Sequence, residues 1–409
     1  MIVLSTVGSL SSRVFVSNGQ APVSKVVVTD IPTPSALVFQ GALGQGVIVV
    51  ASSSTDKLFV LHSGSGTGTY SIGGNFSFDV SPVALVWDSV DGNYYSGNLP
   101  GTVLWVDGDY YGIDGSANVP SPVGLTYDQQ HDLIFAASST SNEIYVINAS
   151  SAAVLSTISV CCTPSSLAYD SENGYLYVAE SAANTVAVID PQNSSIMANV
   201  TVGSNPQYII SEGNVLYVAN YGSNTVSVIN AARDNVETIS VSSEPDSIAY
   251  NSYNGCYYVT DYGSNAVSEI CEGSVAYTIA VGSEPDAVIY DPLEYSILVG
   301  NYGSGTISEI TTPGAPSLPT TTIQTTVGST SQSTSSASSS TSTNATTIAT
   351  ASSISSGSSS TTTQTSAIDF VVSPSYLAII AIVVILISEF GLLAHYMRKR
   401  PRKLPRWAF

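Results

Sequence analysis

The sequence is poor in basic residues, and most of those it has lie at one end. It contains 10 Lys and Arg against 30 Asp and Glu. Six of the ten bases fall within residues 398–409, which leaves four bases and 29 acids in residues 1–370. So acidic a segment repels phosphate groups, and we therefore expect no nucleic-acid partner.

Histidine is also scarce, with His62, His131 and His395 as the three examples. A Ser-His-Asp triad or a His-rich metal centre is hard to assemble from such isolated residues. Walker and dinucleotide-binding motifs are absent from the sequence as well. These absences argue against an enzyme and against a bound organic cofactor.

Charged residues of both signs make up only 10% of the chain, while Ser, Thr, Tyr, Asn and Gly are abundant. A surface with few Lys and Arg suits very acidic surroundings. The carboxyls are protonated there, and the few remaining positive charges repel one another only weakly. We expect residues 1–310 to stay folded near pH 2.

Long hydrophobic runs are missing except for one, YLAIIAIVVILISEFGLLAHY at residues 376–396. Its length and composition predict a transmembrane helix. The basic run that follows predicts a cytoplasmic C-terminus and an extracellular N-terminal part. Residues 311–366, with 36 Ser or Thr in 56 positions, cannot bury a core and are expected to form a disordered stalk.

The first residues, MIVLSTVGSLSS, do not resemble a secretory signal peptide, because they lack a basic region and a long apolar run. Export then needs either a start upstream of this Met or the transmembrane segment itself. We favour the upstream start.

What the chain does have is a repeat. A Pro followed by an apolar strand recurs at Pro34, Pro82, Pro122, Pro164, Pro206, Pro245 and Pro285. The spacings are 48, 40, 42, 42, 39 and 40 residues. A period near 40 built from short strands predicts an all-β propeller, with four strands in each blade.

Seven prolines predict seven blades. The last unit ends after three strands, and SKVVVTD at residues 24–30 is expected to supply its fourth strand and close the ring. Residues 1–18 contain further strand-like sequence, which leaves an eighth, partial blade as an alternative.

The blocks LYVANYGSNTVSVIN, GYLYVAESAANTVAVID and CYYVTDYGSNAVSEI resemble the YVTN-type β-propeller repeat. The similarity is close over about residues 164–310 and degenerate before that. This family is common in archaeal and bacterial surface proteins, so the resemblance implies a propeller and an envelope location. It implies no single activity, because the fold hosts binding modules and enzymes alike.

Two of the four cysteines are expected to pair. The turn Tyr262–Asn265 lies midway between Cys256 and Cys271, which places these residues opposite each other on neighbouring strands. A disulfide between them fits an oxidising exterior. For Cys161 and Cys162 the sequence leaves open a vicinal disulfide or two free thiols, and no metal-binding spacing accompanies them.

One face of the propeller is the candidate binding surface. Because strands alternate in direction, the loop before each Pro and the loop between the second and third strands emerge at the same end. Carboxylates, amides and tyrosines in these loops can bind sugars, or Ca²⁺ through oxygen ligands. The candidate residues are Glu244, Asp246, Asp261, Tyr262, Glu284, Asp286, Asn220, Tyr221, Asn301 and Tyr302.

Five glycosylation sequons lie elsewhere. Asn148 and Asn193 are expected in loops of the opposite face, with Asn199 at the edge of one. Asn75 and Asn344 complete the set, the last within the stalk. Glycans at these positions leave the candidate face clear for a partner.

We therefore divide the chain into a propeller ectodomain (1–310), a stalk (311–370), a transmembrane helix (371–397) and a basic cytoplasmic tail (398–409). The expected function is that of a single-pass surface glycoprotein of archaeal type that binds a glycan or an envelope protein, by adhesion or as part of the envelope. The alternative is an extracellular, metal-dependent, lactonase-like hydrolase with its site at the propeller channel. A purely structural envelope component is a third interpretation.

Overall fold

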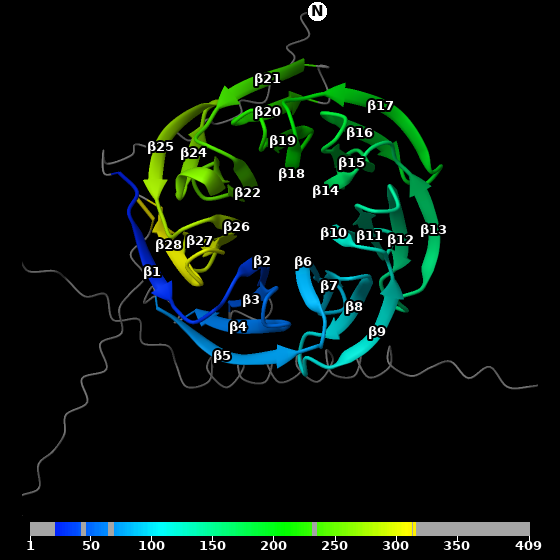
Figure 1. Cartoon of the computed structure of the whole chain (residues 1–409), viewed down its shortest axis with the longest axis horizontal. Coiled ribbons are helices and arrows are strands. Elements are labelled where there is room, and N and C mark those ends of the chain that lie inside the picture. Colours follow the sequence, from blue (N-terminus) through cyan, green and yellow to red (C-terminus); the bar gives the residue numbers. More distant parts are fainter. Residues whose placement is uncertain (1–20, 42–45, 64–68, 231–234, 313, 316–409) are drawn as a thin grey trace, which may run out of the picture. The chain divides into compact units, whose positions relative to one another are not determined.

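The computed structural model describes residues 21–41, 46–63, 69–230, 235–312 and 314–315. These residues form seven four-stranded antiparallel sheets arranged as a ring around a central channel (Figure 1). The seven-bladed all-β propeller predicted from the repeat is thereby confirmed. Residues 1–18, proposed as an eighth blade, lie outside the described residues.

In each blade the first strand lines the channel and the fourth lies at the rim (Figure 1). Blade 1 contains β2 (Pro34–Gln40), β3 (Val47–Ser52), β4 (Lys57–Ser63) and β5 (Tyr70–Ser77). Blade 2 contains β6 (Ser81–Asp88), β7 (Asn93–Leu99), β8 (Thr102–Asp107) and β9 (Ile113–Asn118). Blade 3 contains β10 (Pro122–Asp128), β11 (Leu133–Ser138), β12 (Glu143–Asn148) and β13 (Val154–Ser159). Blade 4 contains β14 (Pro164–Asp170), β15 (Tyr175–Glu180), β16 (Thr185–Asp190) and β17 (Ser195–Thr201).

The remaining blades follow the same plan. Blade 5 contains β18 (Pro206–Glu212), β19 (Val215–Asn220), β20 (Thr225–Asn230) and β21 (Asn235–Ser240). Blade 6 contains β22 (Pro245–Asn251), β23 (Cys256–Asp261), the short 3₁₀ helix η1 (Tyr262–Ser264), β24 (Ala266–Cys271) and β25 (Ser274–Ala280). Blade 7 contains β26 (Pro285–Asp291), β27 (Ser296–Asn301), β28 (Thr306–Thr311) and β1 (Ser24–Val28).

Strand β1 closes the ring by pairing antiparallel with β28, as the sequence predicts. Ser24 lies opposite Ile310 and Lys25 opposite Glu309. The Lys25 Nζ is 2.9 Å from a carboxylate oxygen of Glu309, whose side chain is buried. The two ends of the propeller are therefore joined by main-chain hydrogen bonds and by one ion pair.

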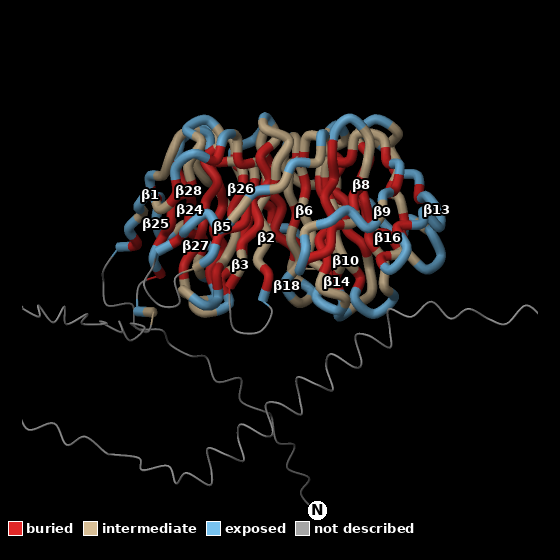
Figure 2. The backbone as a smooth tube through the Cα atoms, turned by 90° about the horizontal axis from the view of Figure 1, so that it is seen from below, coloured by how far each residue is buried: buried red, intermediate tan, exposed pale blue. Residues whose placement is uncertain are grey.

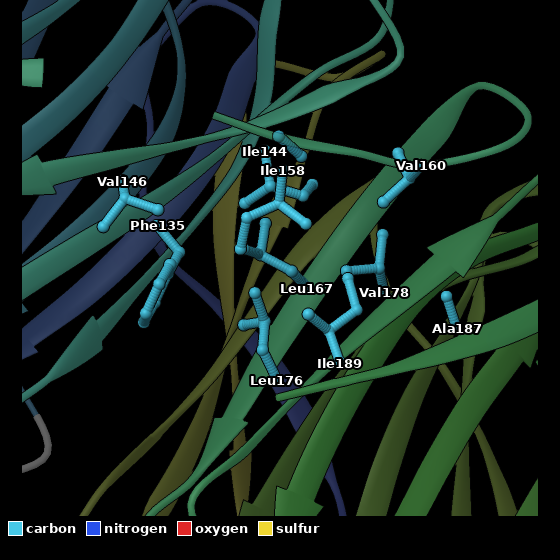
Figure 3. Packing of buried hydrophobic residues seen from close by; sticks show 11 residues of the cluster. Phe135, Ile144, Val146, Ile158, Val160, Leu167, Leu176, Val178, Ala187 and Ile189 are labelled. Carbon is cyan, nitrogen blue, oxygen red and sulfur yellow. The ribbon is translucent and has the colours of Figure 1, made fainter. Parts of the chain in front are cut away.

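The core lies between the blades rather than within them. Each second strand is buried on both faces, so β11 and β15 read as unbroken apolar runs. Figure 3 shows one such interface, in which Phe135 and Ile144 of blade 3 pack with Leu176 and Val178 of blade 4. Burial of each large apolar side chain contributes about 1.5–3 kcal/mol. Because one blade buries its faces only against its neighbours, the hairpin must recur around the whole ring.

Burial falls toward the two ends of the blades, where the turns are exposed (Figure 2). In blades 3–6 the turn between the second and third strands contains an Asn in the left-handed conformation, which Asn adopts more readily than most residues. Its amide oxygen accepts a hydrogen bond from the backbone N–H of the residue preceding the next blade's Pro. The pairs are Asn142 with Thr163, Asn184 with Asn205, Asn224 with Glu244, and Asn265 with Glu284, at 2.8–2.9 Å.

Nothing described here tests the segments predicted beyond the propeller. The transmembrane helix and the cytoplasmic tail, with nearly all of the stalk, lie outside the described residues. Among the residues that are described, no helix is long and apolar enough to cross a membrane.

Candidate functional site

Every first strand carries a β-bulge directly after its Pro. The pairing between first and second strands shifts there in all seven blades, for example between Pro206 and Tyr208 and between Pro285 and Ala287. A bulge re-aims side chains and is common beside binding sites. The residues at this position are Ser35, Val83, Val123, Ser165, Gln207, Asp246 and Asp286, and all seven line one cavity.

This cavity, the channel mouth, has a volume of 770 Å³. It opens at the end of the ring where the loops preceding the first strands lie, since Thr163 and Tyr302 also line it. Its wall has two unlike halves. Blades 5–7 contribute Gln207, Tyr208 and two carboxyls, whereas blades 1–4 contribute Ser, Val and Leu side chains.

Asp246 and Asp286 form the most polar part of the wall. They occupy equivalent positions in β22 and β26, and their carboxyl groups interact electrostatically with each other. Burial raises the pKa of both groups, and the nearby charge of Asp246 raises the pKa of Asp286 further. No Lys, Arg or His is among the described residues that line the mouth, so no positive charge there lowers these pKa values. The pair therefore retains a shared proton well above the usual pH range for aspartate.

Three tyrosines extend the polar half of the wall outward along the edge of the channel mouth. The backbone N–H groups of Tyr221, Tyr262 and Tyr302 donate to the carbonyls of Asn205, Glu244 and Glu284, at 3.0, 2.9 and 2.8 Å. These bonds bring together the two kinds of loop that the sequence placed on one face. Burial, together with the nearby carboxylates of Glu244 and Glu284, raises the pKa of Tyr221 and of Tyr262 to about 12.

Three residues predicted for the same surface do not line the mouth, namely Asn220, Asp261 and Asn301. Each ends a second strand and is fully buried. The Asn220 amide donates to Ser227 at 2.9 Å, and the Asn301 amide donates to Ser308 at 2.9 Å. Asp261 accepts from the Ser268 hydroxyl at 2.7 Å, and burial raises its pKa to about 7. These three side chains hold their blades together instead.

Four residues that line the mouth were not predicted from the sequence, namely Gln207, Tyr208, Ser35 and Ser165. Their signal was available, because each lies one or two residues after a repeat Pro. The Ser35 and Ser165 hydroxyls donate to the carbonyls of the next blade's Pro, at 2.9 and 2.7 Å. Burial raises the pKa of Tyr208, which lies against Asp246.

A cation at the mouth would be held by oxygen. Ca²⁺ takes about six to eight oxygen ligands, and the two Asp carboxylates with the Gln207 amide supply part of such a set. A separate group of Asp88, Asp91 and Asp132 lies at the opposite end of the ring, with ligand atoms within 4.8 Å of one another. It does not border the mouth.

The cysteines form two disulfides of different kinds. Cys256 and Cys271 join β23 to β24, with their Cα atoms 4.6 Å apart. Cys161 and Cys162 are bonded to each other in the loop between β13 and β14, the vicinal alternative that the sequence left open.

The sequons are scattered over the blades. Asn148 ends β12 and Asn193 lies in the turn between β16 and β17, at the end opposite the mouth. Asn75 and Asn199 lie within the rim strands β5 and β17 rather than at a loop edge. Asn344 is outside the described residues.

Comparison with known proteins places this geometry among propellers. Residues 117–248 match a family model described as "Lactonase, 7-bladed beta-propeller", which is less than half of the chain. No curated protein sequence matches the chain.

Solved structures match over most of the propeller. Virginiamycin B lyase from Staphylococcus aureus is 13% identical with a TM-score of 0.60, and the match covers 71% of this chain and 99% of that one. Hydrazine synthase from Kuenenia stuttgartiensis is 16% identical with a TM-score of 0.62, covering 70% and 97%. A catalytically inactive histidine-to-alanine variant of the same lyase with quinupristin has a TM-score of 0.60 at 13% identity, covering 71% and 99%. At these identities the likeness is one of fold, and the chain has the fold of a seven-bladed β-propeller.

Proposed function

We propose that this chain is a membrane-anchored surface propeller whose channel mouth binds a hydroxyl-rich ligand, namely a glycan of the cell envelope or one carried by an envelope protein. The observation that carries the proposal is the interacting carboxyl pair of Asp246 and Asp286 in the wall of a 770 Å³ cavity. The anchor itself is inferred from residues 376–396 of the sequence.

The carboxyl pair suits a sugar because it offers both donors and acceptors. When the pair holds one proton, one oxygen donates while the others accept, and adjacent sugar hydroxyls need both. Hydrogen bonds to charged groups contribute about 1.5–3 kcal/mol each. Tyr208 beside Asp246 adds an aromatic ring with a hydroxyl, a combination that contacts both the apolar and the polar sides of a sugar.

The other half of the mouth suits the same ligand. Ser35 and Ser165 donate to neighbouring blades, and their oxygens retain acceptor capacity toward the cavity. Val83, Val123 and Leu99 add apolar surface. A pocket of mainly apolar and hydroxyl groups with a few convergent polar side chains is the usual form of a small-ligand site.

The test is a binding titration of the full chain in detergent micelles with soluble envelope glycans. Replacing both carboxyls, Asp246→Asn with Asp286→Asn, is expected to weaken binding by at least about tenfold, because charge-assisted hydrogen bonds are lost. Asp114→Asn is the matched control, since Asp114 is exposed on β9 at the rim. Equal affinity of the double variant and the control would contradict the proposal.

A second candidate is a metal-dependent, lactonase-like hydrolase acting at the same mouth. It is favoured by the family model that matches residues 117–248. The two His residues within the described chain lie elsewhere, His62 on β4 and His131 beside Asp128 at 2.6 Å. Lactone hydrolysis that requires an added divalent cation and is lost in the Asp246→Asn, Asp286→Asn variant would support the hydrolase over the binding module.

A further inference from the structure

The loop that leads into blade 4 differs from its counterparts by carrying a disulfide between adjacent residues. Cys161 and Cys162 occupy the place that Gly203–Ser204 takes before β18 and Ser242–Ser243 takes before β22. Cys161 is exposed and Cys162 is half-buried, whereas in the second disulfide Cys256 is buried and Cys271 is half-buried. An exposed cysteine is therefore present in the first disulfide but not in the second.

The Cys161–Cys162 bond adds little to the fold. In the chain-entropy argument a disulfide stabilises by closing a loop, and the effect grows with loop length. Adjacent cysteines close almost no chain, whereas Cys256 and Cys271 are separated by 15 positions. Stability is therefore not a sufficient reason for this bond.

Hydrogen bonds hold the loop independently of the disulfide. The Cys161 N–H donates to Glu180 at 2.9 Å, and the Thr163 N–H donates to Asn142 at 2.8 Å. The Ser181 N–H donates to the Thr163 carbonyl at 3.1 Å. Glu180, which is buried, also accepts from the Thr185 hydroxyl at 2.8 Å. Cleavage of the sulfur–sulfur bond consequently leaves the loop between β13 and β14 in place.

We propose that Cys161–Cys162 is a thiol–disulfide exchange site that takes low-molecular-weight thiols at the rim of the channel mouth. Exposed disulfides are the labile ones, and exchange begins with attack of a thiolate on an accessible sulfur. This inference is independent of the proposed glycan ligand.

The reaction balances without any further reagent. An external thiolate attacks Sγ of Cys161, a mixed disulfide forms, and the bond to Cys162 breaks. The released electron pair stays on Cys162 Sγ, which takes a proton from water. The thiolate of a second external thiol then attacks the external sulfur of the mixed disulfide. The two external thiols leave as one disulfide, and Cys161 Sγ is released as a thiolate that takes a proton. Two external thiols are thus oxidised while the protein pair is reduced to a dithiol. Attack by Cys162 on the mixed disulfide reverses the first step.

The site borders the mouth, because Thr163 and Pro164 directly after it line the cavity that Asp246 and Asp286 also line. A small thiol joined to Cys161 in the mixed disulfide therefore lies at the entrance of the channel mouth. There it occupies space through which a ligand must pass.

The test is differential reactivity within one molecule. The full chain in detergent is incubated with reduced glutathione at pH 8, quenched with N-ethylmaleimide and mapped by peptide mass spectrometry. We expect a glutathione adduct on Cys161, or a doubly alkylated pair, at concentrations that leave Cys256–Cys271 intact. Reaction of both disulfides at the same rate overturns the proposal, as does alkylation of Cys161 and Cys162 before any thiol is added.

Paired variants separate an exchange site from a structural bridge. Cys161→Ser with Cys162→Ser is expected to leave the melting temperature within about 1 °C of the parent, whereas Cys256→Ser with Cys271→Ser lowers it by roughly 5 °C or more. Comparable losses in both variants would assign the vicinal bond a structural role and overturn the proposal.

Discussion

The carboxyl groups of Asp246 and Asp286 line the same cavity and interact electrostatically although they belong to different blades. In both blades a register shift directly after the repeat Pro accompanies the placement of the carboxyl in the cavity wall, so the repeat itself creates the pair. Such groups titrate together, and the proton they share belongs to the pair.

Substitution of one member should change the titration of the other. In Asp246→Asn the repulsion between two carboxylates is gone, so the pKa of Asp286 falls, while burial still holds it above the ordinary value. Carbon-13 NMR of chains labelled at the aspartate carboxyl measures this directly. An unchanged Asp286 titration would show that the two groups do not interact, and Asp114→Asn serves as the control spectrum.

Asp261 is expected to make the propeller less stable as pH rises. Its folded-state pKa is about 7, while the unfolded chain loses this proton near pH 4. Between these values the folded state binds more protons, so the free energy of unfolding falls with rising pH, by up to about 4 kcal/mol from this group. Asp261→Asn places there the residue that blades 5 and 7 have at Asn220 and Asn301.

Thermal unfolding at pH 4 and pH 8 measures that difference. The parent chain should lose more stability between the two pH values than Asp261→Asn does. Equal losses would show that Asp261 does not keep its proton in the folded state.

The whole propeller should tolerate acid. Burial raises the pKa of further carboxyls, and only the exposed Asp190 has a lowered one among the resolved shifts. Each raised pKa gives stability that is complete at low pH and is lost as pH rises through the folded-state value. The further raised carboxyls are Asp88, Glu212, Glu269 and Asp291. Circular dichroism from pH 8 to pH 2 should show a folded chain throughout, and acid unfolding that begins above about pH 4 would refute this expectation.

The ring closure should depend on Lys25. Lys25→Met leaves the buried Glu309 without this cation, 2.9 Å away in the parent. We expect a loss of about 1–3 kcal/mol in the free energy of unfolding, measured by urea denaturation. Lys57→Met, at the start of β4, is the control. Similar effects of both substitutions would show that the ion pair contributes nothing specific.

The architecture was readable because it repeats. Seven prolines at a spacing near 40 residues predicted seven blades, with an eighth left open, and the missing fourth strand pointed to residues 24–30. The site was readable only in part. Asp246, Asp286 and the rim tyrosines were found from loop topology, but Asp261 was misplaced because a turn residue and a strand-terminal residue look alike in sequence. Whether its side chain points outward depends on the strand register, which the sequence pattern leaves one residue uncertain.

The closing strand also sets an order for biogenesis. Ser24 pairs with Ile310, so β1 leaves the ribosome long before its partner β28 exists. Until then the backbone of β1 has no strand in this sheet with which to form hydrogen bonds. Its Val26 side chain also lacks that neighbouring strand, and it is still 54% exposed in the finished ring. Non-local pairing of this kind is slow, and an unpaired strand edge invites association with other chains. The first of the described strands along the chain is thus the last to find its partner, and the ring stays open until the seventh blade has been made.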